Sequence, residues 1–141
     1  MGKLTKEDIT LLFLEDPEKL VNEILNNNVP KSDEIRTLIC DLGSPADAYY
    51  YARDIDKFPH PDTRREACKD PVFAYYYAYY VDRSPRSDTR QGACKDSYRA
   101  YYYAYYVDRS PRSDTRQGAC KAPYWKERYE QWEKECLLGK T

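Results

Sequence analysis

A segment of 22 residues occurs twice in this chain without a single change. Residues 74–95 read AYYYAYYVDRSPRSDTRQGACK, and residues 100–121 repeat them at a period of 26 residues. A diverged copy starts 26 residues earlier at Ala48, and a partial copy runs from Cys120 to Trp132. A still earlier unit aligns when two residues are inserted around Leu42-Gly43. Tandem units of this length predict an array in which each unit packs on its neighbours.

Each unit has the start and stop signals of two short helices. Asp70 followed by Pro71 is typical of a helix start, because aspartate caps the first turn and proline has no N–H to leave unpaired there. This helix is predicted to end near Val81, where Asp-Arg-Ser-Pro follows. Ser87 or Asp88 is expected to cap a shorter helix that ends near Lys95. The same starts recur at Asp16-Pro17, Ser44-Pro45 and Asp96-Ser97, and Thr5 with Asp8 predicts a capping box for a helix carrying Ile9, Leu12 and Phe13.

The buried face of the first helix follows from helical periodicity. At 100° per residue one stripe holds Ala74, Tyr77, Ala78 and Val81, and an adjoining stripe holds Phe73, Tyr77 and Tyr80. In the last copy the first stripe becomes Lys126, Glu130 and Glu133, whereas the second remains apolar as Trp125, Tyr129, Trp132 and Cys136. We therefore expect the first stripe to contact the following helix and the second to contact the preceding repeat. The second helix should bury Thr89, Gly92 and Ala93, matched by Ile35, Leu38 and Ile39 in the first unit.

The sequence thus predicts an all-α fold, an α-solenoid of about 3.5 short hairpins in a single domain, 1–141. Its expected parts are an N-terminal helical cap with the first hairpin (1–41), three repeats (42–68, 69–94 and 95–120) and a C-terminal capping helix (121–138). The pattern A-x-x-Y-A-x-x-V, then Arg and Pro, over residues 41–132 resembles the short tandem helical-hairpin repeat proteins of bacteria and phages. The resemblance implies an architecture like that of HEAT and tetratricopeptide arrays, with an interaction role. A phage origin would make a host or virion component the expected protein partner.

Catalytic and metal-binding patterns are lacking in the sequence. The five cysteines contain no C-x-x-C pair, and His60 is the only histidine, so a Cys/His metal set is not expected. Cys40, Cys68, Cys94 and Cys120 occupy one column of the repeat and are expected to be reduced thiols. Reduced thiols and the lack of a long apolar run favour a cytoplasmic protein, in the host cytoplasm if the chain is viral. We expect no enzyme activity, no cofactor and no membrane partner, and the oligomeric state stays open.

The tyrosines suggest a binding surface. The chain has 16 of them, and several are predicted to lie opposite the two buried stripes. The predicted partner-binding residues are Tyr75, Tyr79, Tyr98, Tyr101, Tyr105 and Tyr124. A continuous face of exposed aromatic rings is typical of a protein-interaction site.

Arginines beside the tyrosines keep a second function open. The whole chain has 23 basic and 24 acidic residues, which excludes a polybasic arm, but residues 48–121 carry 14 basic against 10 acidic groups. Aromatic rings interleaved with arginines can bind single-stranded nucleic acid by stacking and phosphate contacts. The arginines predicted for that alternative are Arg83, Arg86, Arg109 and Arg112. Asp82 and Asp88 lie among them, so internal ion pairs and caps are an equally compatible interpretation.

Overall fold

The computed structural model describes residues 2–139, and all the regular secondary structure in that range is helical. This confirms the predicted all-α class. The chain divides into two compact units, an N-terminal unit (Met1–Ala67) and a C-terminal unit (Cys68–Thr141). The assignment of the chain to a single domain remains a prediction, and each unit is described by itself.

The N-terminal unit starts with the capping box expected at Thr5, whose hydroxyl accepts from the Asp8 amide at 3.1 Å. Its core contains Leu20, Ile24, Ile39 and other buried residues, and Ile9 and Leu12 pack against it, whereas Phe13 is 42% exposed. Its helices are α1 (Lys6–Glu15), α2 (Pro17–Leu25), α3 (Asp33–Leu42), α4 (Pro45–Tyr50), the π-helix η1 (Tyr51–Asp56) and α5 (Pro61–Ala67).

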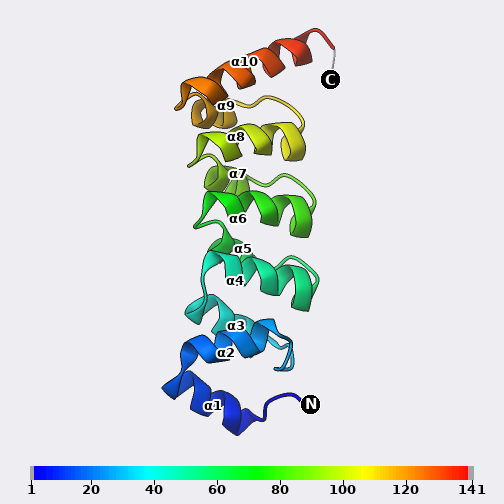
Figure 1. Ribbon diagram of the computed structural model, residues 1–141. Helices are drawn as coiled ribbons and strands as arrows, with labels where there is room; N and C mark the ends of the chain where they lie inside the picture. Colours follow the sequence, from blue (N-terminus) through cyan, green and yellow to red (C-terminus); the bar gives the residue numbers. More distant parts are fainter. Residues whose placement is uncertain (1, 140–141) are drawn as a thin grey trace. The chain divides into compact units, whose positions relative to one another are not determined.

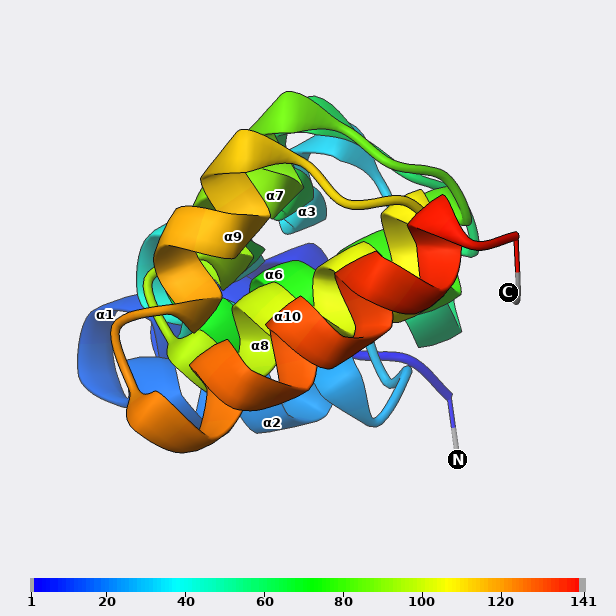
Figure 2. The same cartoon turned by 90° about the horizontal axis from the view of Figure 1, so that it is seen from above.

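The C-terminal unit holds the two identical segments as two helical hairpins and a closing helix. Its helices are α6 (Pro71–Tyr76), the π-helix η2 (Tyr77–Asp82), α7 (Ser87–Ala93), α8 (Ser97–Tyr102), the π-helix η3 (Tyr103–Asp108), α9 (Ser113–Ala119) and α10 (Pro123–Leu137). Figures 1 and 2 show α6, α8 and α10 in one row, with α7 and α9 in a second row beside it. The two hairpins cover residues 71–93 and 97–119.

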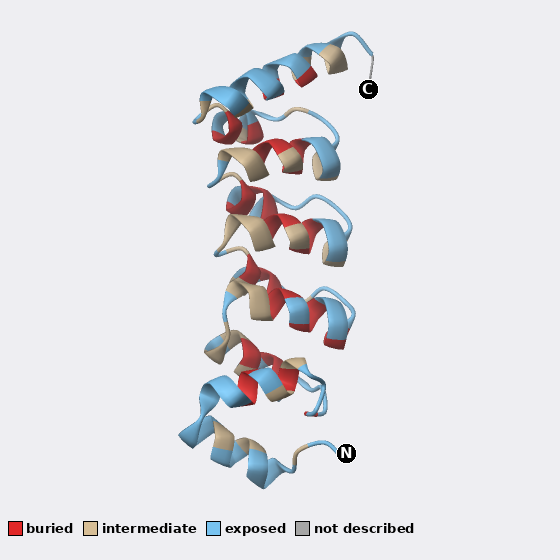
Figure 3. Cartoon of the chain, in the orientation of Figure 1, coloured by how far each residue is buried: buried red, intermediate tan, exposed pale blue. Residues whose placement is uncertain are grey.

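Glycine and alanine set how closely the two rows approach. A Cβ atom at Gly92 would lie 2.8 Å from the Ala74 Cβ and 2.8 Å from the Cys68 carbonyl oxygen, and Gly118 is in the same position against Ala100. The alanine stripe of one helix therefore packs on the helix that follows it, as predicted. Figure 3 shows the buried residues of the C-terminal unit on the facing sides of its two rows.

The second half of each long helix differs from the prediction. Residues 77–82 and 103–108 form π-helices, in which hydrogen bonds join residues five apart, rather than a continuation of the α-helix to Val81. The wider turn places Tyr103 and Asp108 on one side, where both contact α7. The Tyr103 hydroxyl lies 2.7 Å from the Thr89 hydroxyl, and Asp108 pairs with Arg90 at 2.8 Å.

The α10 helix makes the same contacts without a π-turn. Its Tyr129 hydroxyl lies 2.8 Å from the Thr115 hydroxyl, and Glu133, only four residues later, pairs with Arg116. The tyrosine and the acidic residue that contact the preceding helix are thus five residues apart in the π-helix η3 and four residues apart in the α-helix α10. This spacing accounts for the choice of helix type.

The caps of the short helices also differ from the prediction. Asp70 and Asp96 cap α6 and α8 as expected. The N-cap of α7 is Arg86, however, and not Ser87 or Asp88. The Arg86 amide instead donates 2.9 Å to the Tyr103 hydroxyl of the next repeat. A tyrosine from the neighbouring hairpin therefore satisfies the N-cap amide, from which the N3 side chain accepts in a capping box, while Asp88 accepts from the Thr89 amide at 2.8 Å.

The helix α10 closes the C-terminal unit as predicted. Tyr129 and Trp132 are buried, while Lys126, Glu130 and Lys134 on its outer side are exposed. A polar outer face at the end of a stack prevents another unit from adding there.

Candidate functional site

The structure separates the predicted partner-binding tyrosines into two groups. Tyr79, Tyr105 and Tyr124 are exposed, at 42%, 40% and 58%. Tyr75 and Tyr101 are buried, with 7% and 8% exposed, so the expectation that they share the exposed face is wrong. Tyr98 is half-buried.

Tyr75 and Tyr101 lie in the α-helical segments α6 and α8, where the rings of Tyr102 and Trp125 pack against them. The π-helices explain a second departure from the predicted face. The predicted face assumes a constant 100° per residue, but each residue of a π-helix advances by a smaller angle. The rotation turns Tyr80 outward, although the same periodicity had placed it in a buried stripe. Tyr80 is 50% exposed and its copy Tyr106 is 43% exposed.

Four exposed rings from η2 and η3 form one continuous surface, which we call the tyrosine row: Tyr79, Tyr80, Tyr105 and Tyr106. Ring centroids lie 4.8 Å apart within each pair and 6.4 Å apart between Tyr79 and Tyr106. The contacts are edge-to-face, with interplanar angles from 67° to 86°. The four rings are therefore mutually supported rather than free to rotate independently.

A buried aromatic layer supports the tyrosine row. Tyr75 lies 5.9 Å from Tyr79, and Tyr101 lies 5.8 Å from Tyr105, measured between ring centroids. Trp132 of the closing helix contacts Tyr105 at 5.7 Å. Burial raises the pKa of both Tyr75 and Tyr101, so their hydroxyls stay neutral. Such packing fixes the exposed rings before any partner arrives, which lowers the entropy lost on binding.

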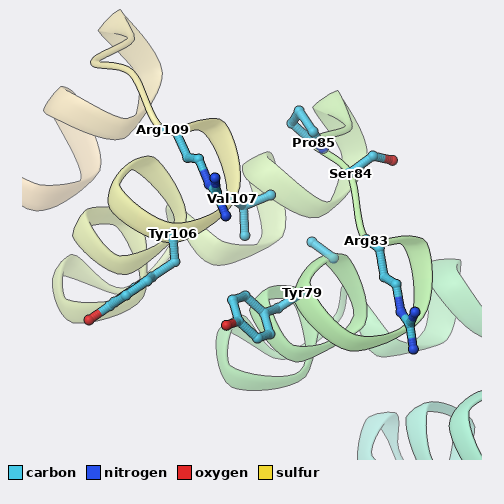
Figure 4. Close-up of a pocket in the computed structure, with 8 residues that line it drawn as sticks. Tyr79, Arg83, Ser84, Pro85, Tyr106, Val107 and Arg109 are labelled. Carbon is cyan, nitrogen blue, oxygen red and sulfur yellow. The ribbon is translucent and has the colours of Figure 1, made fainter. Parts of the chain in front are cut away.

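A surface pocket of about 410 Å³ opens between the ends of η2 and η3. Its lining includes Tyr79 and Tyr106 of the tyrosine row, together with Arg83, Arg109 and Pro85. Figure 4 shows Tyr106 and Arg109 coming from one repeat and Tyr79 and Arg83 from the other, with the two arginine side chains extending in the same direction. Two repeats thus contribute to one concave site, and its arginines are at equivalent positions.

Arg83 and Arg109 have an unusual backbone. Each follows the last residue of a π-helix and has a positive φ, 54° and 57°, in the left-handed region that favours glycine. Within residues 2–139 neither forms an ion pair, and both are exposed. Lys57 at the end of η1 has the same conformation, with a φ of 60°, so this backbone is a property of the repeat.

The other two arginines of the nucleic-acid alternative are not equivalent to this pair. Arg86 pairs with Asp88 at 3.3 Å, and Arg112 lies 3.9 Å from Asp114. Neither of them lines the pocket. The structure therefore brings together only Arg83 and Arg109 from that set.

Tyr98 and Tyr124 lie at the opposite ends of their helices, away from the pocket. Tyr98 stacks on Tyr102 with centroids 4.4 Å apart and also holds the Arg99 guanidinium 4.4 Å from its ring. Tyr124 packs at 4.7 Å against Trp125. These two tyrosines do not join the tyrosine row.

The remaining reactive groups have structural surroundings. Burial raises the pKa of the Cys40 and Cys94 thiols to about 12, which makes them poor nucleophiles. The His60 ring nitrogen accepts from the Asp62 amide at 3.1 Å, as part of the turn before α5. Asp54 is paired with Arg53 at 2.7 Å. Over the described part of the chain, no group of three or more histidine, cysteine or acidic residues is placed to hold a metal ion.

No family model, curated protein or solved structure matches this chain. Among residues 2–139, no helix is both long and apolar enough to cross a membrane.

Proposed function

We propose that this protein is a non-enzymatic protein-binding module that holds its partner on the tyrosine row. The observation that carries the proposal is the set of four rings, each 40–50% exposed, fixed on a buried aromatic layer. Tyrosine offers a large apolar surface and a hydroxyl at little entropic cost, and it is enriched in protein interfaces for that reason. The resemblance to helical-hairpin repeat proteins supports an interaction role, with a host or virion component as partner if the chain comes from a phage.

Single-stranded nucleic acid is the second candidate ligand. The unpaired, exposed guanidinium groups of Arg83 and Arg109 beside the rings favour it, because aromatic stacking and phosphate contacts bind single strands together. The edge-to-face packing of the rings counts against it, since a base needs an open ring face. Protein binding is therefore the function that the geometry supports better.

Affinity capture from a cell lysate, with and without nuclease, tests the proposal. The tagged protein is compared with a variant in which all four residues of the tyrosine row are changed to serine. Each of these residues is exposed, so the variant should fold, and its far-UV circular dichroism checks this. We expect nuclease-resistant capture of a protein by the unmodified chain and its loss in the variant.

A matched control uses tyrosines outside the row. Changing Tyr98 and Tyr124 to serine removes rings from the same unit at the other ends of the helices, and capture should persist. Capture that the fourfold variant retains would refute the role of the tyrosine row. Capture abolished by nuclease, together with binding to oligonucleotides that falls steeply with salt, would favour the nucleic-acid alternative.

A further inference from the structure

The pocket beside the tyrosine row has a positive lining. Arg83 and Arg109 contribute the only charged side chains among the lining residues, and the others include two tyrosines, a serine and a proline. The C-terminal unit as a whole carries 14 basic and 10 acidic residues. A ligand that leaves both guanidinium groups satisfied must therefore bring negative charge, and carboxylates fit the planar arginine fork in a bidentate manner.

The spacing of the two arginines restricts the conformation of such a ligand. They occupy equivalent positions of neighbouring repeats, at the ends of packed helices η2 and η3. Packed helices lie roughly 8–10 Å apart. A polyproline II segment rises about 3.1 Å per residue with three residues per turn, so residues three apart lie on one side at a separation of about 9 Å. The repeat of the protein thus matches one turn of this ligand.

The rings supply the second half of the recognition. Aromatic grooves bind polyproline II segments because the ligand is already extended and loses little entropy. Tyr79 and Tyr106 line the pocket, and both are exposed. Resting on the proposed protein-binding function, we propose that the pocket binds an acidic polyproline II segment of a protein partner, with carboxylates three residues apart on Arg83 and Arg109.

Two synthetic peptides of equal composition test the spacing. One repeats Asp-Pro-Pro, so that a carboxylate occurs at every third position, and the other has the same residues with the aspartates placed consecutively. Isothermal titration calorimetry measures each dissociation constant with the full chain. We expect the Asp-Pro-Pro peptide to bind at least about fivefold more tightly, because only its carboxylates reach both arginines together.

Two double variants test the residues. Changing Arg83 and Arg109 to asparagine removes both charges and keeps a residue that tolerates the left-handed backbone. This variant should lose at least about tenfold in affinity for the Asp-Pro-Pro peptide, as expected when charge-assisted hydrogen bonds are deleted. The control changes Arg86 and Arg112 to asparagine, which removes the same charge outside the pocket. Its affinity should change by less than about threefold, the effect of long-range charge alone.

Several outcomes would overturn the inference. Equal binding of the two peptides would contradict the spacing argument, and an equal loss in the two double variants would contradict the role of the pocket. Tighter binding of an oligothymidylate, in competition with the peptide, would assign the arginines to nucleic acid. The proposed function has its own test: it would be refuted, independently of the peptide results, if the fourfold serine variant of the tyrosine row still captured its partner.

Discussion

Tyrosines at equivalent positions in the two units should respond differently to the loss of a single oxygen atom. Tyr51, Tyr103 and Tyr129 each begin or replace a π-segment and are fully buried. The Tyr103 hydroxyl accepts from the Arg86 amide at 2.9 Å and lies 2.7 Å from the Thr89 hydroxyl. Replacing Tyr103 with phenylalanine leaves the amide at the N-cap of α7 without a partner. Such a loss costs about 1–3 kcal/mol.

Tyr51 lacks this support. Ile35 stands in the N-terminal unit at the repeat position of Thr89, and the buried Tyr51 hydroxyl has no hydrogen-bond partner of normal geometry among the described residues. Burial raises the pKa of Tyr51 to about 12. Replacing Tyr51 with phenylalanine removes a buried hydroxyl whose contact with the Ser32 backbone falls outside normal hydrogen-bond geometry. Its effect should lie between zero and a stabilisation of about 1 kcal/mol.

Urea denaturation measures the contrast. Trp125 and Trp132 make intrinsic fluorescence a probe of the C-terminal unit, and far-UV circular dichroism follows both units. Tyr129→Phe tests a second tyrosine whose hydroxyl is hydrogen-bonded, because it contacts Arg112 and Thr115 as the Tyr103 hydroxyl contacts Arg86 and Thr89. A loss for Tyr51→Phe as large as that for Tyr103→Phe would refute the reasoning.

A double-mutant cycle isolates the missing partner. Ile35→Thr supplies a hydroxyl at the position from which Thr89 contacts Tyr103. The substitution loses apolar burial in any background, but only with Tyr51 present can it gain a hydrogen bond. We expect a coupling of about 0.5–1.5 kcal/mol between Ile35→Thr and Tyr51→Phe. A coupling of zero would show that the two side chains are not placed as Thr89 and Tyr103 are.

Four further predictions follow from the same packing. Trp132→Ala should cost about 3–5 kcal/mol, because it uncovers the end of the C-terminal unit, and an unchanged urea midpoint would contradict this. Gly92→Ala should destabilise by about 1–3 kcal/mol in the same assay, because the new Cβ would lie 2.8 Å from the Ala74 Cβ. A stabilisation would show instead that the higher helix propensity of alanine outweighs this clash. Arg83→Gly should stabilise by up to about 1 kcal/mol, as the left-handed backbone suits glycine, whereas destabilisation would point to an unseen contact. Burial raises the pKa of Tyr103 to about 12, above its ordinary value of about 10, so the stability it contributes is complete below pH ~10 and lost as pH rises toward ~12, which alkaline denaturation checks.

Much of the fold could be predicted because its signals are local. Asp70 and Asp96 cap helices in any context that continues with helix-forming residues, and the structure uses them in that way. The closing helix was predictable because its outer positions turn polar while Trp132 stays apolar. The small residues Gly92 and Gly118 pointed to close helix contacts, since no side chain separates the helices there.

Two members of the tyrosine row, Tyr79 and Tyr105, could be predicted, but Tyr80 and Tyr106 could not, because helical periodicity assumes a single helix type. A signal for the π-turn was nevertheless present in the spacing of charged partners. Tyr103 precedes Asp108 by five residues, whereas Tyr129 precedes Glu133 by four. Two side chains that must reach the same neighbouring helix lie on one side at four residues in an α-helix and at five in a π-helix. Reading this spacing would have turned Tyr80 and Tyr106 outward.

Tyr79, Arg83 and Arg109 were candidates from the sequence, but the backbone conformation that places the two arginines at the pocket had no such signal. A left-handed residue after a helix is usually glycine, and Arg83 and Arg109 stand there instead. Their backbone conformation depends on where the π-helix ends, and that depends in turn on ion pairs such as Arg90–Asp108 with a different helix. Local sequence patterns do not carry tertiary information of this kind.

The pocket depends on two consecutive copies of the repeat. It needs a tyrosine and an arginine from each of two consecutive helix ends, so a single repeat cannot form it. In α10 Trp132, which lies 26 residues after Tyr106, is buried, and Lys134 follows Glu133 as Arg109 follows Asp108. The closing helix therefore supplies no exposed ring at this place, and the tyrosine row ends where the identical copies end. Arg83 and Arg109 have the same left-handed backbone conformation, so their side chains leave the chain in the same way. A ligand with a regularly repeated charge can therefore bind both arginines at once.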